Sequence, residues 1–146
     1  KIIIVILGLL GLLPLLFGLI DLWVNNKNLL FGINITKNFG VIILSFLGAV
    51  YWGFIINTKV STNLSNKFKV VTLLWSVLPS IVGIFVLAIE NPFSILILTF
   101  GFLMCHIADE IYNKLLLFPR GYILLRRILS FIVINILILS FFIGKG

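Results

Sequence analysis

One short segment, Cys105–Glu110, gathers most of the side chains in this sequence that could do chemistry. It supplies a thiol, an imidazole and two carboxylates. His106 is three residues before Asp109 and four before Glu110, so on a helix the three share one face. Such a face can contact a cofactor, move a proton or form ion pairs. The candidates for a cofactor contact are His106, Asp109 and the nearby Tyr112.

A resident metal or haem is not expected at this segment. Zinc sites use three or four N, S or O ligands, and Cys105 points about 100° away from His106 around a helix. A bis-histidine haem needs a second histidine, and the chain has one. Met104 is adjacent to His106, so the two cannot bind one iron from opposite sides. We therefore expect no metal ligands, no cofactor and no catalytic residue, while a haem shared with a partner subunit stays a separate possibility.

Ion pairing is the simpler role for the two carboxylates. Arg126 and Arg127 begin the last apolar segment of the chain, next in sequence to the segment that carries Asp109 and Glu110. A charge near the membrane interface costs less than one at the bilayer centre, because long side chains reach the headgroups. We therefore predict interfacial ion pairs between these carboxylates and these arginines.

The elements that must position these residues are apolar segments long enough to cross a membrane. Hydrophobic residues make up 62% of the chain and charged residues 10%, against about half and a quarter in soluble domains. A spanning helix needs about 20 mostly apolar residues. The sequence predicts an all-α, five-helix transmembrane bundle, a single integral membrane domain over residues 1–146. The predicted helices cover residues 2–24, 39–57, 70–89, 93–111 and 122–143, and the first is expected to be retained rather than cleaved as a signal peptide.

Five helices place the two termini on opposite sides of the membrane, so the basic residues can be sorted by side. The side of the N-terminus receives Lys1, Lys59, Lys67, Lys69, Lys114, Arg120, Arg126 and Arg127, and the other side receives Lys27, Lys37 and Lys145. The positive-inside rule then predicts an N-terminus inside and a C-terminus outside. The net charge of +7 is explained by this topology and by contact with anionic lipids, so no nucleic-acid partner is expected.

Small residues predict how the helices pack, because lipid offers no hydrophobic drive for helix association and close backbone approach must replace it. We expect helices two and three to form the central pair, with helix one against them. The residues assigned to this packing are Ser45, Ala49, Gly53, Ser76, Pro79, Ser80 and Gly83. Pro14 and Pro79 each remove a helical hydrogen bond and predict kinks. Asn135 is expected to be buried and to bond across helices.

Three strings resemble those of a known family. They are ILSFLGAVYWG at Ile43–Gly53, WSVLPS at Trp75–Ser80 and YILLRRILS at Tyr122–Ser130, preceded by GLLP at Gly11–Pro14. In this order they resemble the transmembrane protein 69 family, small polytopic proteins of bacterial inner membranes and mitochondria that are grouped under a domain of unknown function. The resemblance implies a membrane location and this architecture, and it transfers no catalytic residue. Members often have His or Arg where this chain has Tyr51, a departure that removes a polar group.

Three functions compete on these observations. The first is a non-catalytic accessory or assembly subunit of a respiratory or energy-transducing inner-membrane complex, with other membrane subunits as partners. The second is a small transporter or channel, whose polar path would have to use Ser45, Ser76, Ser80, Thr99, Asn135 and the break at Pro79. The third is a haem- or quinone-associated membrane subunit that uses His106, Asp109 and Tyr112. We expect the first, and no enzymatic activity.

Overall fold

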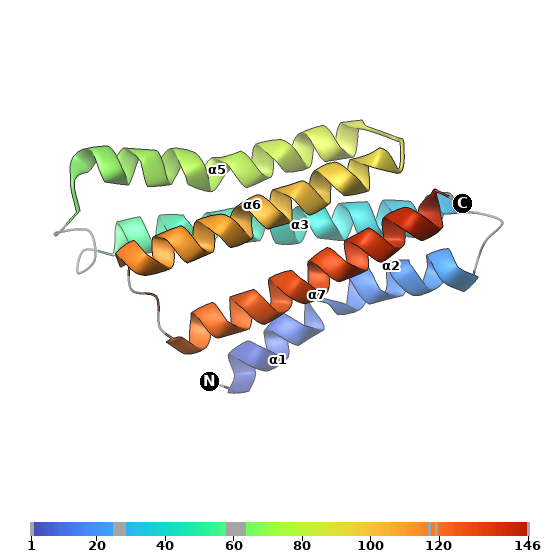
Figure 1. Cartoon of the computed structure of the whole chain (residues 1–146), viewed down its shortest axis with the longest axis horizontal. Helices are drawn as coiled ribbons and strands as arrows, with labels where there is room; N and C mark the ends of the chain where they lie inside the picture. Colours follow the sequence, from blue (N-terminus) through green and yellow to red (C-terminus); the bar gives the residue numbers. More distant parts are fainter. Residues whose placement is uncertain (1, 25–28, 58–63, 117, 119, 146) are drawn as a thin grey trace.

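The computed structural model describes residues 2–24, 29–57, 64–116, 118 and 120–145, nearly all of them in α-helices (Figure 1). The helices are α1 (Ile2–Leu10), α2 (Leu13–Val24), α3 (Leu29–Ile56), α5 (Asn66–Ala88), α6 (Phe93–Leu116) and α7 (Arg120–Gly144). In the described residues, five segments are long and apolar enough to cross a membrane: Val5–Val24, Leu29–Ile56, Asn66–Ala88, Phe93–Lys114 and Gly121–Gly144. The prediction of an all-α protein with five spanning helices is confirmed.

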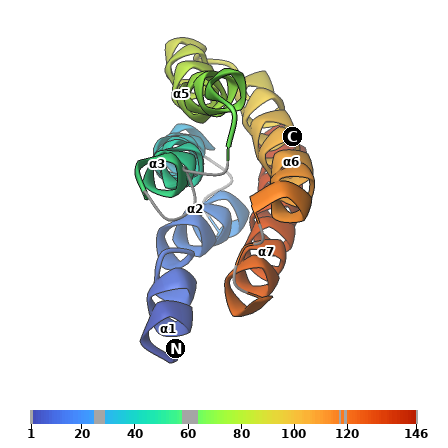
Figure 2. The ribbon, with the colours of Figure 1, turned by 90° about the vertical axis from the view of Figure 1, so that its left-hand side faces the viewer.

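The helices form two layers. One layer holds α5, α3 and the α1–α2 segment side by side, and the other holds α6 and α7 (Figure 2). The contact between α3 and α5 is the most extensive, followed by those of α2 with α3 and α6 with α7. Helix α3 therefore lies at the centre of the fold and touches both layers. The N- and C-termini lie at opposite ends of the long axis (Figure 1).

The first spanning segment is broken rather than continuous. A turn at Gly11 and Leu12 separates α1 from α2, and the Leu12 amide donates to the Leu9 carbonyl at 3.0 Å, three residues back. Pro14 is the second residue of α2 and has no amide hydrogen to donate to the carbonyl four residues earlier. The predicted kink is present, with the break just before the proline.

Helix α3 begins at Leu29, ten residues earlier than predicted. Polar residues around Lys37 lower the local hydropathy, yet the chain remains helical because this stretch packs closely. A Cβ at Gly32 would lie 2.7 Å from Leu22 of α2, and one at Gly18 would lie 2.5 Å from the Thr36 hydroxyl. The assignment of Lys37 to an outer connector is wrong, since its side chain is 4% exposed inside the bundle. Lys1, Lys27 and Lys59 lie outside the described residues.

The contact between α3 and α5 is centred on Gly48, which the sequence analysis did not select. A Cβ at Gly48 would collide with the Ser76 carbonyl oxygen and lie 3.0 Å from Pro79. One turn further along α5, a Cβ at Gly83 would lie 2.6 Å from Val41 and 3.7 Å from the Ser45 hydroxyl. The pairing of these two helices is as predicted, with Ser45, Ser76, Pro79 and Gly83 at the contact and Ser80 half-buried.

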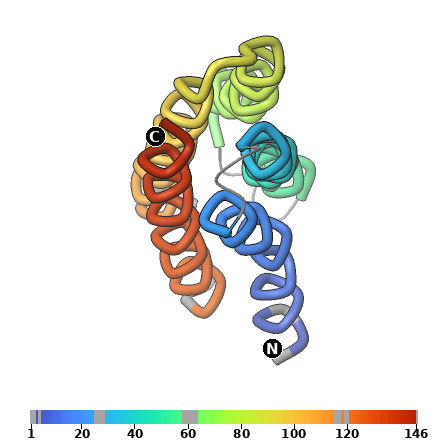
Figure 3. The backbone as a smooth tube through the Cα atoms, turned by 90° about the vertical axis from the view of Figure 1, so that its right-hand side faces the viewer, coloured from blue at the N-terminus to red at the C-terminus, as the bar shows by residue number. Residues whose placement is uncertain are grey.

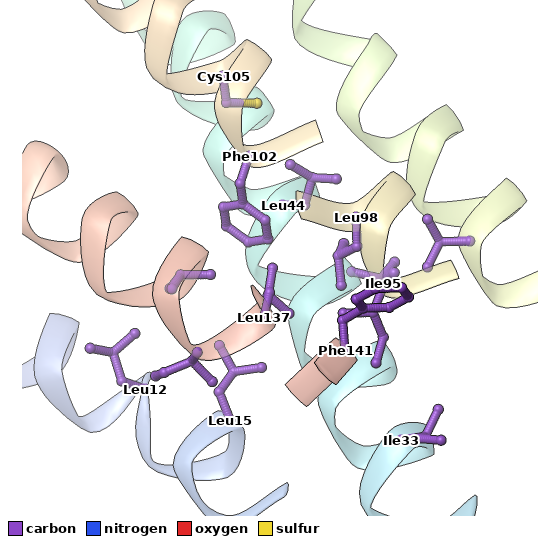
Figure 4. Packing of buried hydrophobic residues seen from close by; sticks show 14 of the residues in the cluster. Leu12, Leu15, Ile33, Leu44, Ile95, Leu98, Phe102, Cys105, Leu137 and Phe141 are labelled. Atoms are coloured by element: carbon purple, nitrogen blue, oxygen red, sulfur yellow. The ribbon is translucent and has the colours of Figure 1, made fainter. Parts of the chain in front are cut away.

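Two of the predicted packing residues lie elsewhere. Ala49 and Gly53 are exposed, and a Cβ at Gly53 would meet nothing within 4 Å. Their assignment to packing within this chain is wrong, because the face that meets α5 is turned toward Gly48. Between the layers, apolar side chains from α2, α3, α6 and α7 fill the core (Figure 4), among them Leu15, Leu44, Leu98, Phe102 and Leu137.

Candidate functional site

Four side chains from three helices form a buried network at the end of the bundle that carries the N-terminus. They are Tyr51 of α3, Asp109 of α6, and Tyr122 and Arg126 of α7, and we call them the buried network. Asp109 is 1% exposed, Arg126 5% and Tyr51 not at all. A charged pair so deeply buried is stable only when its remaining hydrogen-bonding groups also find partners.

Both oxygens of the Asp109 carboxylate accept hydrogen bonds. The Tyr51 hydroxyl donates to Oδ1 at 2.5 Å, and Arg126 Nε donates to Oδ2 at 2.7 Å. Bonds to a charged group are stronger than bonds between neutral groups. Asp109 thus joins α3 and α7 through α6.

All three nitrogens of the Arg126 guanidinium donate hydrogen bonds. Nη1 donates to the Tyr122 hydroxyl at 2.8 Å, and Nη2 donates to the Leu47 carbonyl at 3.4 Å. Its central carbon also lies 5.8 Å from the centre of the Tyr51 ring and 5.7 Å from that of Tyr122, within the range of a cation–π contact. The guanidinium is therefore held by hydrogen bonds and by two aromatic rings.

An aromatic cluster packs around this network. The Tyr51 ring lies 4.8 Å from Tyr112 and 6.3 Å from Phe118, centre to centre. Phe118 lies between α6 and α7 in the chain, and its ring is 4.4 Å from Phe54 and 5.8 Å from Tyr122. These rings exclude water and lower the local dielectric, which strengthens the attraction between the paired charges.

The network lies a short way inside the membrane-spanning region. Asp109 is five residues before the end of its span at Lys114, and Arg126 is five residues after the start of its span at Gly121. At 1.5 Å of rise per residue, both lie about 8 Å from the ends of their spans. In an apolar environment a charged pair depends on the hydrogen bonds that the protein itself supplies.

A second ion pair lies beside the network but faces outward. Arg127 binds Glu110 through two bonds, Nε to Oε1 at 2.5 Å and Nη2 to Oε2 at 2.6 Å. The Arg127 side chain is 46% exposed and that of Glu110 35%. The structure therefore pairs these carboxylates with these arginines, as expected from the sequence, with one pair buried and the other exposed.

The three residues proposed as cofactor contacts do not converge on an empty site. Asp109 is fully engaged in the network, and the Tyr112 ring packs on Tyr51. His106 is half-buried, and its Nδ1 atom has no hydrogen-bond partner in the described part of the chain. The same described residues contain no grouping of three or more His, Cys, Asp or Glu side chains that could hold a metal ion.

Three residues of the proposed polar path, Ser76, Thr99 and Asn135, bond within their own helices. Ser76 donates to Leu73 at 2.6 Å rather than to the carbonyl freed by Pro79, and Thr99 donates to Ile95 at 2.7 Å. Asn135 is exposed and donates to the Phe131 carbonyl at 2.7 Å. The prediction that Asn135 is buried and bonds across helices is therefore wrong. None of these three hydrogen bonds, all between described residues, links one helix to another.

Three residues whose side chains form contacts inside the bundle were not identified from the sequence. Tyr51 was read as the loss of a polar group, although its hydroxyl supplies a donor to Asp109. Tyr122 is four residues before Arg126, a spacing that puts both on one helix face and could have revealed the contact. Lys37 is flanked by Thr36 and Asn38, so the local hydropathy did not indicate that it lies inside the bundle. The two charges of the buried network neutralise each other. Its hydrogen bonds therefore serve to hold α3, α6 and α7 together.

Comparison with known proteins places the whole bundle in one family. Residues 1–142 match the family described as Protein of unknown function (DUF3429). No curated protein matches the chain, and no solved structure does. The match covers the first four membrane-spanning helices, all but the last two residues of the fifth, and every residue of the buried network. The chain belongs to the DUF3429 family.

Proposed function

We propose that this chain is a non-catalytic membrane subunit that binds another membrane protein through the outward face of α3. The observation that carries the proposal is the pair Ala49 and Gly53, four residues apart and both exposed. Small residues at this spacing let the backbone of a second helix approach closely. Among the described residues, no atom lies within 4 Å of a Cβ placed at Gly53.

The surroundings of this pair suit a partner helix. Ile42, Phe46 and Ile56 lie on the same face of α3 and are 61%, 73% and 68% exposed. The bulky residues can pack around a partner while the small ones admit its backbone. We call Ile42, Phe46, Ala49, Gly53 and Ile56 the α3 outer face.

The opposite side of α3 is anchored. Tyr51 binds Asp109 there, and Gly48 packs against α5. A helix fixed from behind presents its outer face without a large ordering cost on binding. This rigidity supports a scaffolding role more than a gating one.

The larger setting follows the resemblance to the transmembrane protein 69 family. On that basis we infer an accessory or assembly role in a respiratory or energy-transducing complex of a bacterial or mitochondrial inner membrane. The cationic end of the bundle, with the exposed Lys67 and Lys114, would contact anionic lipids on the inner side.

The test is purification of the full chain from its native membrane in mild detergent, followed by cross-linking and identification of bound proteins. A hetero-complex is expected, and Ala49→Leu with Gly53→Leu should abolish it. Ala88→Leu, at another exposed small residue, is the matched control and should leave the complex intact. Recovery of monomer alone, or of a homodimer alone, in every mild detergent would contradict the proposal.

A further inference from the structure

A polar side chain faces outward near the middle of the last membrane-spanning helix. Asn135 of α7 is exposed, and it lies 14 residues after the start of its span at Gly121 and nine residues before the end at Gly144. At 1.5 Å of rise per residue, it is about 14 Å from the nearer end. The serine and threonine side chains in the central turns of the described spans are instead buried or half-buried, namely Ser45, Ser76, Ser80, Thr99 and Ser130.

The amide of Asn135 is only partly satisfied by its own chain. Its Nδ2 group donates one hydrogen bond, to the Phe131 carbonyl at 2.7 Å. An asparagine amide has two donor hydrogens and an acceptor oxygen, so one hydrogen and Oδ1 have no partner among the described residues. Polar groups without a partner are unfavourable in hydrocarbon. Asn135 therefore points to a hydrogen-bonding partner outside this chain.

The exposed residues of α7 around Asn135 follow a seven-residue repeat. Six of them recur at alternating spacings of four and three residues, and we call them the α7 seam: Leu124, Ile128, Phe131, Asn135, Ile138 and Phe142. Its five apolar members are between 38% and 70% exposed. In heptad notation, Ile128, Asn135 and Phe142 fall at position a and the others at position d. Such a repeat is typical of helices that pair in a left-handed coiled coil, a packing that membrane bundles also use.

The α7 seam lies on the outside of the bundle. Helix α7 contacts α6, α2, α3 and α1, and in Figure 3 it runs (in red) along the outer side, with α1, α2 and α3 on its inner side. Arg127 lies beside the seam and is bound to Glu110 of the same chain, so this pair brings no unpaired charge to a docking helix. The α3 outer face belongs to the other layer (Figure 2), so the two surfaces are separate.

We propose that the α7 seam binds the α7 seam of a second copy of this chain, which gives a two-fold symmetric dimer. Two copies inserted in one membrane have the same orientation, so a two-fold axis along the membrane normal makes their α7 helices parallel. Each seam residue then faces the same residue of the other copy at the same depth. A single Asn at position a is the feature that fixes register and oligomeric state in parallel coiled coils.

The chemistry of an amide favours a second copy over an unrelated helix. Because an amide is both donor and acceptor, two Asn135 side chains that face each other can bond reciprocally. An unrelated helix would need a suitable polar group at this one depth, whereas symmetry supplies it in a second copy. The apolar seam residues on both sides then pack around the bonded amides.

Disulfide cross-linking of single cysteines in native membranes tests the symmetry. In a full chain with Cys105 replaced by Ser, Leu124→Cys and Phe131→Cys are each oxidised with copper phenanthroline. Both should give a covalent dimer, because a residue at position d faces its own copy across the two-fold axis. Ile84→Cys, at a residue of α5 that is 67% exposed, is the control and should give none.

Substitution of Asn135 tests the hydrogen bond. Dimerisation of the purified full chain is measured by energy transfer between labelled copies as the ratio of detergent to protein is varied. Asn135→Leu should weaken the dimer by about 3- to 20-fold, the range for hydrogen bonds between membrane helices, without lowering the stability of the monomer. Asn135→Gln keeps the amide and should retain most of the dimer. Asn34→Leu, at another exposed asparagine, should leave the dimer unchanged.

Three results would overturn the proposal. They are a monomer at every detergent ratio and in lipid vesicles, cross-linking at Ile84→Cys as strong as at the α7 seam, and a dimer that Asn135→Leu does not weaken. Failure here is distinct from failure of the proposed function. Ala49→Leu with Gly53→Leu should remove the hetero-complex and spare this dimer, while Asn135→Leu should weaken the dimer and spare binding at the α3 outer face.

Discussion

A carboxylate and a guanidinium that are almost fully buried depend on each other and on their neutral neighbours. Asp109 and Arg126 have lost nearly all contact with solvent, so the bonds from Tyr51 and Tyr122 replace those that water would make. Their neighbours Glu110 and Arg127 form a pair at the surface whose N–O distance is 2.5 Å, against 2.7 Å for the buried pair. The two pairs are one residue apart in sequence and differ in burial, which allows a direct comparison of the two environments.

Removing one partner of the buried pair should destabilise the protein strongly. We expect Arg126→Met to lower the free energy of unfolding by about 3–5 kcal/mol, because it leaves Asp109 charged and buried without a counter-ion. Asp109→Leu combined with Arg126→Met should cost less than the sum of the two single changes. Unfolding of the purified protein in detergent measures all three.

The exposed pair is the control for that comparison. Arg127→Met should change the stability little, since surface pairs are screened by solvent. Equal losses for Arg126→Met and Arg127→Met, or strict additivity in the double variant, would contradict the account of the buried network.

The Tyr51 hydroxyl provides a second test at this scale. Tyr51→Phe keeps the ring contacts and removes the donor to Asp109, so we expect a loss of about 1.5–3 kcal/mol in the same unfolding measurement. Tyr112→Phe removes a hydroxyl that is not part of the buried network and should have a smaller effect. If the two substitutions proved equivalent, the bond to Asp109 would not matter for stability.

At the scale of elements, hydropathy predicted the helices where apolar residues run without interruption. The span that begins at Phe93 was predicted from its first residue, but the start of α3 was placed ten residues late. Polar residues such as Lys37 lower the local hydropathy, and their accommodation depends on tertiary contacts. The carbonyl of Ile89 that binds Lys37 is 52 residues away in sequence, so no local pattern could reveal it.

The candidate site could likewise be predicted only in part, because some of its contacts depend on tertiary packing. Asp109 and Glu110 could be matched with Arg126 and Arg127 because a five-helix topology brings them to one end. Tyr51 could not be added, because its contact with Asp109 depends on the register between α3 and α6. The packing face of α3 was likewise misplaced, since only the packed structure shows that Gly48 and not Gly53 meets α5.

This difference between two glycines gives a test of helix packing. Gly48→Val places a side chain against the Ser76 carbonyl and Pro79, and overpacking of this kind costs about 1–3 kcal/mol. Gly53→Val enters open space and should leave the unfolding free energy nearly unchanged, while it obstructs the α3 outer face. Unfolding in detergent and recovery of the partner complex would separate the two effects. Equal destabilisation by both variants would contradict the packing described here.

At the scale of the whole molecule, charge is distributed unequally between the two ends. In the described residues, Lys67, Lys69, Lys114, Arg126 and Arg127 lie toward the end of the N-terminus. The other end, where α3 begins and α7 ends (Figure 1), carries Lys37 and Lys145. Within the first group, Arg126 and Arg127 are paired with carboxylates. Its three lysines can interact with lipid headgroups. Basic residues near helix ends are retained on the inner side of the membrane during insertion.

The topology prediction can be tested with single cysteines. The natural Cys105 is 1% exposed and, replaced by Ser, gives a silent background. In cells or spheroplasts, a membrane-impermeant maleimide should label Lys145→Cys without permeabilisation and Lys67→Cys only after it. The reason is that the cationic end is held inside. If both positions were labelled from the same side, the odd number of spans would be wrong; if the pattern were reversed, the positive-inside assignment would be wrong while the bundle itself stood.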